Sequence, residues 1–149
     1  MRGIRFQIPN LHDRYLEKIF ENVSVEEYDW IINEESEIFI GRSNGLFEVG
    51  VINGVEMKKR ICIDKYYLVF VNFQAIPSGC EYYDLIDYNS YMKSKCVMVL
   101  FVTDSMFVEF YAKNEEVILQ IKSNAEKYCF SEIEFITDEN FNNESFQAS

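Results

Sequence analysis

The order of apolar and polar positions is most regular over residues 96–113. Residues 97–102 are continuously apolar and rich in strand-forming side chains, which is typical of a strand buried on both faces. Asp104 and Ser105 are residue types that form turns, and residues 107–112 then alternate so that only one face carries a charge. The pattern predicts a hairpin whose first strand is central and whose second strand lies nearer an edge of the sheet.

A helix is predicted directly after this hairpin. Asn114 is suited to an N-cap, and Glu115 and Glu116 would lie in the first turn, where the helix dipole favours negative charge. Helical spacing continues through the apolar residues Val117, Ile118, Ile121, Ala125 and Tyr128. Residues 133–136 then have the composition of a short strand.

The remaining chain also alternates between the two-residue period of strands and the 3.6-residue period of helices. Strands are predicted at residues 4–8, 26–32, 38–40 and 66–76, and helices at residues 11–20, 55–63 and 87–95. Within the uncertain stretch 42–54, Asn44-Gly45 is a hairpin turn signal, and Asn53-Gly54 is either a turn or the entry to a helix. The order strand, helix, strand over residues 66–103 allows a parallel crossover.

These elements predict an α+β fold in one domain, residues 1–149. We expect a mixed, mostly antiparallel sheet of five to seven strands, centred on residues 66–76 and 96–103, with helices mainly on one face. Residues 137–149 are rich in Asn, Asp, Glu and Ser, so a mobile tail is predicted from about residue 141.

Composition indicates where the protein is located in the cell and whether its cysteines are reduced. A chain of 149 residues is long enough for one core without cross-links. It contains no apolar run near the roughly 20 residues that span a bilayer, and its N-terminus is too charged for a signal peptide. We therefore expect a cytoplasmic protein. Four cysteines without a Cys-x-x-Cys pair, and one histidine, predict reduced thiols and no zinc site.

The net charge of −11 is unevenly distributed. Residues 1–75 carry 9 basic and 12 acidic side chains, whereas residues 76–149 carry 5 and 13. Such a surface repels nucleic-acid phosphates and anionic membranes, so we expect neither as a partner. A basic protein partner remains possible, and so does the alternative that the charge only keeps the protein soluble.

Few side chains suggest catalysis. The chain has no Gly-rich phosphate loop and no nucleophile elbow, and no cofactor is predicted. Asp104, Asp138 and Glu139 follow predicted strands, and a hard cation such as magnesium could use such carboxylates. A plain turn explains Asp104 equally well, and no metal is assigned.

Aromatic side chains are the better candidates for a binding surface. Trp30, Tyr82 and Tyr83 stand beside acidic residues near strand ends or loops. Tyrosine and tryptophan are enriched at protein interfaces because they combine a large contact area with a polar group. The alternative is that these rings complete a satellite core.

Five segments resemble a known family. They are residues 1–10, 28–32, 66–70, 99–105 and 135–140. Together they are similar to a small uncharacterised family of Bacillus-type bacteria, catalogued as a domain of unknown function. The resemblance implies a bacterial, single-domain, cytoplasmic protein, and it implies no catalytic residues.

Two hypotheses for function follow. The preferred one is a non-enzymatic interaction module whose acidic, aromatic face binds a basic protein, and immunity-type proteins that neutralise toxins are an analogous class. The alternative is a small-molecule or divalent-metal-dependent enzyme that uses Asp104, Asp138 and Glu139. A homodimer is also possible if residues 107–112 form an exposed edge.

Overall fold

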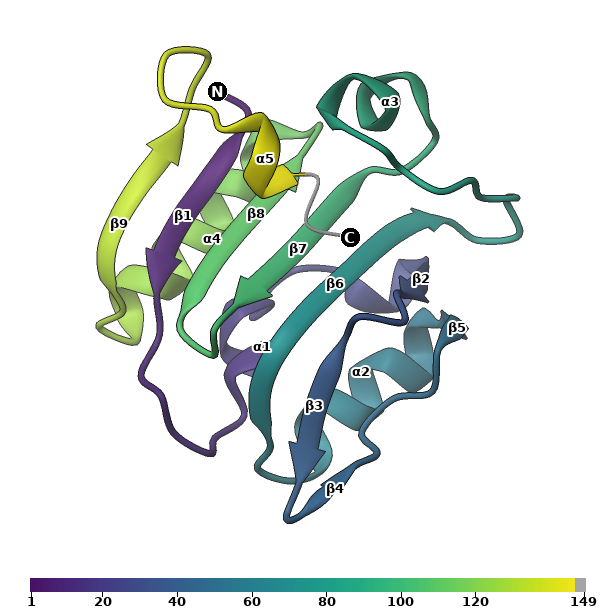
Figure 1. Cartoon of the computed structure of the whole chain (residues 1–149), viewed down its shortest axis with the longest axis vertical. Helices are drawn as coiled ribbons and strands as arrows, with labels where there is room; N and C mark the ends of the chain where they lie inside the picture. Colours follow the sequence, from purple (N-terminus) through teal and green to yellow (C-terminus); the bar gives the residue numbers. More distant parts are fainter. Residues whose placement is uncertain (147–149) are drawn as a thin grey trace.

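The computed structural model describes residues 1–146, except for the side chains of residues 44, 144 and 145 (Figure 1). Its strands are β1 (Gly3–Gln7), β2 (Tyr28–Ile32), β3 (Glu37–Ile40), β4 (Ser43–Asn44), β5 (Gly50–Asn53), β6 (Tyr67–Pro77), β7 (Met98–Thr103), β8 (Phe107–Ala112) and β9 (Ser131–Ile136). Its helices are α1 (Tyr15–Ile19), α2 (Gly54–Ile63), α3 (Tyr88–Lys93), α4 (Glu115–Lys127) and α5 (Asn143–Phe146), with a 3-10 turn at Val25–Glu27.

The nine strands form one sheet, in which seven follow the order β4-β3-β6-β7-β8-β1-β9 and β2 and β5 lie off this path. The long strand β6 pairs with β3 along its first half and with β2 along its second half, and β5 pairs with β2. Within residues 1–146 every strand pairing is antiparallel. The predicted α+β fold with a mostly antiparallel sheet is confirmed, and the number of strands is higher than expected.

Two details of the predicted topology need correction. Strands β6 and β7 pair antiparallel, with Val71 opposite Val102, so the short helix α3 makes no parallel crossover. Strand β8 pairs with both β7 and β1, so it is an interior strand and offers no edge for a homodimer. Its charged face is only partly exposed, because Phe107 is 48% exposed and Glu109 is half-buried, whereas Tyr111 is fully buried. The alternation of apolar and polar residues indicates which face of a strand is buried. It does not indicate whether the strand lies at an edge, because that depends on which strands pair with it.

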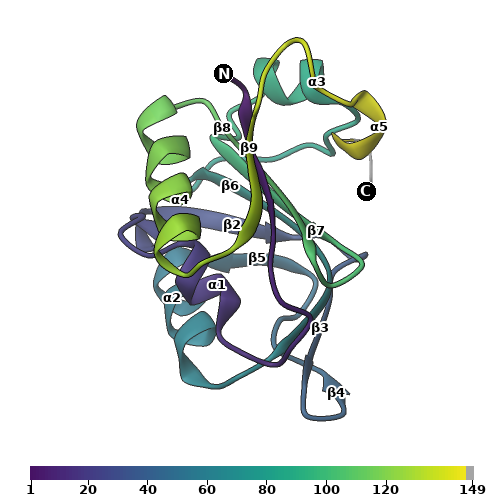
Figure 2. The same ribbon diagram turned by 90° about the vertical axis from the view of Figure 1, so that its left-hand side faces the viewer.

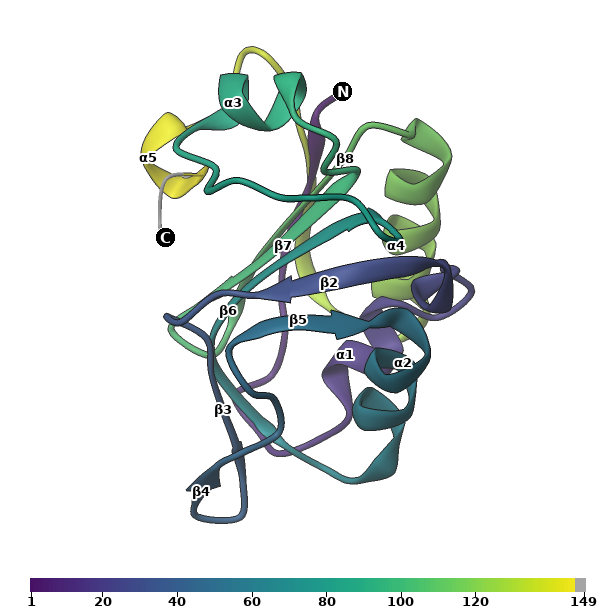
Figure 3. The ribbon, with the colours of Figure 1, turned by 90° about the vertical axis from the view of Figure 1, so that its right-hand side faces the viewer.

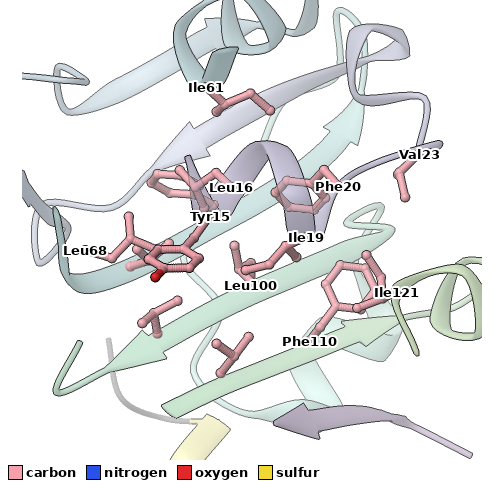
Figure 4. Packing of buried hydrophobic residues seen from close by; sticks show 14 of the residues in the cluster. Tyr15, Leu16, Ile19, Phe20, Val23, Ile61, Leu68, Leu100, Phe110 and Ile121 are labelled. Atoms are coloured by element: carbon pink, nitrogen blue, oxygen red, sulfur yellow. The ribbon is translucent and has the colours of Figure 1, made fainter. Parts of the chain in front are cut away.

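The main core lies between one face of the sheet and helices α1, α2 and α4 (Figure 2). Strand β7 sends Met98, Leu100 and Val102 into this core and Val99 and Phe101 to the opposite face. All five side chains are buried, as predicted for a central strand. Figure 4 shows the aromatic and aliphatic side chains of α1 packed among residues of the sheet, α2 and α4.

Polar residues set the beginning of the helices. The side chains of Asn53, Asp87 and Asn114 accept hydrogen bonds from the first backbone N–H groups of α2, α3 and α4. Asn53-Gly54 is therefore a helix entry. The hairpin turn expected at Asn44-Gly45 lies instead at Gly41 and Arg42, with a φ of +62° at Gly41, because Ile40 pairs with Ser43.

The second face of the sheet is covered only in part, by α3, α5 and an aromatic cluster. The guanidinium group of Arg2 lies 4.4 Å from the ring centres of both Tyr88 and Phe141, and its Nε donates to Asp138 at 2.8 Å. Phe146 is 2% exposed within this cluster. Phe141 and Phe146 thus both pack against the second face of the sheet. The mobile tail expected from about residue 141 stays a prediction, and residues 147–149 lie outside the described part.

No helix within residues 1–146 is long and apolar enough to cross a membrane.

Candidate functional site

The segment that joins β6 to α3, residues 78–87, carries the predicted binding residues Tyr82 and Tyr83. This segment leaves the end of β6 and crosses to α3 without regular structure (Figure 3). Tyr82 is 42% exposed and Tyr83 is 77% exposed. Both rings are therefore available to a partner, and Tyr82 also lines two clefts beneath the segment.

Hydrogen bonds at both ends of the segment fix its course. Gly79 has a φ of +79°, and its N–H donates to the Asp29 carboxylate on β2 at 3.0 Å. At the other end, Asp87 and Ser90 form a reciprocal capping box at the start of α3. Between these ends, Leu85 packs against the hydrophobic cluster of the second face. The segment is thus held to the sheet by Gly79 and Leu85 and to α3 by the capping box, while its tyrosines are exposed.

The first cleft has a volume of about 690 Å³ and lies between this segment, the end of β2 and the start of β5. We call it the acidic cleft. Its lining residues are Ile31, Ile32, Asn33, Glu34, Glu35, Val49, Gly50, Gln74, Tyr82, Asp84, Leu85 and Ile86. This set contains three carboxylates and no basic side chain. Its volume falls within the usual range of ligand-binding pockets.

The second cleft, of about 510 Å³, lies on the other side of Tyr82, and we call it the loop cleft. Its charges are mixed, because Lys93, Lys95 and Glu81 all line it. Cys96 also lines it, and burial raises the pKa of its thiol to about 12. This thiol is therefore protonated at neutral pH, which does not suit a nucleophile.

Four residues line both clefts: Ile31, Gln74, Tyr82 and Leu85. Gln74 is the polar residue of their shared floor. It lies on β6 opposite Ile31 of β2 and Val99 of β7, and it is only 6% exposed. Within the described part of the chain, its side-chain amide makes no hydrogen bond, and the amide is open to the clefts.

Trp30 does not belong to this surface. It is fully buried in the main core, and its indole N–H donates to the carbonyl of Val25 at 3.0 Å. Its ring packs edge-on against Phe20 at 5.2 Å. Trp30 is therefore a core residue whose one polar group is satisfied, and its prediction as a binding residue is corrected.

The three predicted carboxylates are not brought together. Asp104 lies in the exposed turn before Phe107, which pairs with Gln7 at one end of β1. Asp138 and Glu139 follow β9 beyond the other end of β1, because Gly3 pairs with Ile136. Four residue steps along β1 separate the two ends by about 13 Å.

One ion could not bind all three carboxylates at that separation. Asp138 instead pairs with Arg2, and within residues 1–146 no group of three or more His, Cys, Asp or Glu side chains could hold a metal ion. The geometry therefore gives no support to the carboxylate-based enzyme hypothesis.

The sequence analysis missed Glu34, Glu35 and Gln74. The glutamates are adjacent, and spacing alone does not show that the turn after β2 places them opposite Asp84. Gln74 had a visible signal, because it and Asn72 interrupt the otherwise apolar central strand β6. Two amides on one face of a buried strand indicate either an internal hydrogen-bond network or a ligand-binding surface.

Comparison with known proteins identifies relatives without a known activity. The family model described as "Protein of unknown function (DUF2691)" matches residues 1–147. An uncharacterised protein of Bacillus subtilis (strain 168), YncE, is 31% identical over 143 residues, covering 93% of this chain and 94% of the relative. No solved structure matches the chain.

Proposed function

The chain belongs to the DUF2691 family of proteins of unknown function, and from that premise we propose that it is a non-enzymatic interaction module for a basic protein. The predicted resemblance to an uncharacterised family of Bacillus-type bacteria is confirmed. We place the interaction in the cytoplasm, and an immunity-like role is one form that it could take. The acidic cleft is the observation that supports this proposal.

The chemistry of the cleft favours a cationic side chain. Glu34, Glu35 and Asp84 line it without a basic residue among its described lining, and none of the three forms a salt bridge within the described residues. Their charges are thus available to a partner. The overall charge of −11 adds a long-range field that attracts a basic protein and speeds its association.

Apolar and aromatic surface beside these charges supplies contact area. Tyr82 and Ile86 line the cleft and are 42% and 73% exposed, and the 77% exposed Tyr83 is next to Tyr82. Interfaces commonly place aromatic anchors beside polar groups that set specificity. The acidic cleft thus combines both kinds of group, as expected for binding a lysine or arginine side chain together with its aliphatic stem.

The test compares two triple variants that lose the same charge. The cleft variant is E34Q/E35Q/D84N, and the control is D104N/E132Q/E139Q, whose three carboxylates are exposed and lie outside the cleft. A fluorescently labelled, capped pentalysine peptide serves as the probe, and fluorescence anisotropy measures its binding at low and high salt.

We expect the cleft variant to lose at least tenfold in affinity and the control variant less than threefold, since only the former removes local contacts. Binding of the wild type should weaken as salt increases. Equal losses in the two variants would show that only the net charge attracts the peptide, and the proposal would then be wrong.

A further inference from the structure

The floor shared by the two clefts contains an amide that has no hydrogen-bond partner within the described part of the chain. Gln74 is 6% exposed and lines both clefts. Its amide atoms are not among the described side-chain atoms that are closed off from solvent without a partner, so they are open to the clefts. Water or the polar group of a ligand can therefore bind this amide there.

Neighbouring side chains do not satisfy this amide. Gln74 lies between Ile31 on β2 and Val99 on β7, both of them aliphatic. Tyr82 and Leu85 cover it from the segment above. Its amide N–H₂ and C=O therefore face a floor that is otherwise apolar, and the open directions are the two clefts.

We propose that Gln74 binds the main chain of an extended partner segment whose basic side chain enters the acidic cleft. This inference rests on the proposed function and specifies its binding mode. A glutamine amide has one donor group and one acceptor, which match the C=O and N–H of a peptide bond. The basic side chain belongs in the acidic cleft because the loop cleft also carries Lys93 and Lys95.

Asn72 provides an internal comparison. It lies two residues from Gln74 on the same face of β6, and it is 2% exposed. Neither polar atom of its side chain has a hydrogen-bond partner, yet Asn72 lines neither cleft. The two amides thus share chemistry and strand, and they differ in accessibility, because only the amide of Gln74 is open to the clefts.

The experiment uses two peptides and three proteins. The peptides are the capped pentalysine and its backbone N-methylated counterpart, which has the same charge and no peptide N–H. The proteins are the wild type, Gln74→Leu and the matched control Asn72→Leu. Fluorescence anisotropy gives the affinities, and thermal unfolding without peptide gives the stabilities.

We expect the wild type and Asn72→Leu to prefer the unmodified peptide by about three- to tenfold, the range for one or two hydrogen bonds. Gln74→Leu should bind both peptides equally and should unfold at about the wild-type temperature, because the amide that it removes has no hydrogen-bond partner within the described part of the chain. A glutamine with a structural role would instead give a lower unfolding temperature.

Each contrary outcome has a distinct meaning. Equal binding of the two peptides by the wild type would overturn the role of Gln74 and leave the acidic cleft as the binding site, and this arm does not depend on any variant folding. A marked loss of stability in Gln74→Leu would also overturn that role. Failure of both peptides to bind the wild type would overturn the proposed function as well.

Discussion

Replacing Asn124 should reveal how α4 holds the end of α1. Asn124 is 2% exposed, and its amide nitrogen donates to the carbonyl of Ile19 at 2.8 Å and to that of Glu21 at 2.7 Å. These carbonyls lie at the C-terminal end of α1, where a helix lacks internal partners. One side chain from a helix about 100 residues away thus completes the hydrogen bonding of α1.

The magnitude for Asn124→Ala follows mainly from three effects. The bond that Asn124 Oδ1 accepts from Gln120 at 2.9 Å is lost as well, but the half-buried Gln120 can bind water instead. A buried, unpaired Ile19 carbonyl costs about 1–3 kcal/mol. Loss of the part-buried bond to Glu21 lowers the free energy of unfolding by about 0.5–1.5 kcal/mol. The higher helix propensity of alanine raises it by about 0.5 kcal/mol. The expected decrease in the free energy of unfolding is therefore about 1–4 kcal/mol.

Urea unfolding measures this decrease directly. Trp30 is the one tryptophan and is fully buried in the main core, so its fluorescence reports loss of the core. The midpoint should fall with an unchanged slope. Ser123→Ala, at the exposed preceding position of α4, is the control and should stay within about 0.5 kcal/mol of wild type. If Asn124→Ala behaved like this control, the assigned role of Asn124 would be wrong.

Asn124→Asp sharpens the test because it retains the shape and removes the donor. The new carboxylate would face two carbonyl oxygens in a buried site, so its pKa in the folded protein should lie above its unfolded value of about 3.9. The neutral form is then favoured in the folded state. Asn124→Asp should therefore be less stable than Asn124→Ala at pH 7, and this gap should narrow as the pH falls through the raised folded pKa.

Three further predictions concern other parts of the fold. Burial raises the pKa of the Cys96 thiol to about 12, above its unfolded value of about 8.5. The protonated thiol therefore adds stability that is lost as the pH rises from about 8.5 through 12. Thiol labelling of the native protein at pH 8 should modify the exposed Cys129 and spare Cys96, and equal labelling of the two would contradict this prediction. Arg2→Ala should lower the free energy of unfolding by about 1–2 kcal/mol and expose the C-terminal segment to proteolysis, whereas Arg2→Lys should keep part of the cation–π energy. Unchanged proteolysis of Arg2→Ala would show that Arg2 does not hold Phe141 in place. Gly54→Ala should lower the folded yield and the melting temperature, because its Cβ would lie 2.4 Å from two backbone oxygens, and a wild-type melting temperature would show that this contact relaxes easily.

Much of the fold was predictable because local sequence decides it. The continuous apolar run of β7 and the capping residue Asn114 gave elements that the structure retains. Local sequence patterns gave a wrong prediction where residues distant in the chain determine the structure. The helical face expected from Leu11 begins only at Tyr15, and Leu11 is 63% exposed, because the preceding stretch bridges to Tyr66 instead.

The candidate site was only partly predictable. Tyr82 and Tyr83 could be singled out because tyrosines beside acidic residues in a loop are typical of interfaces, and they are exposed. Trp30 has the same local context, yet it is buried, because β2 pairs with both β5 and β6 beneath α2. Exposure depends on neighbours from other parts of the chain, and sequence spacing does not contain that information.

The sequence by itself determined the α+β class, the central strands, the Asn114 cap of α4 and the acidic charge. Each depends on periodicity, backbone propensity or composition, which act over a few residues. Tertiary structure alone placed Glu34 and Glu35 opposite Asp84, separated Asp104 from Asp138, and put the unpaired amide of Gln74 beneath Tyr82. Those arrangements depend on the pairing of strands distant in the chain, which the packing of the whole sheet fixes.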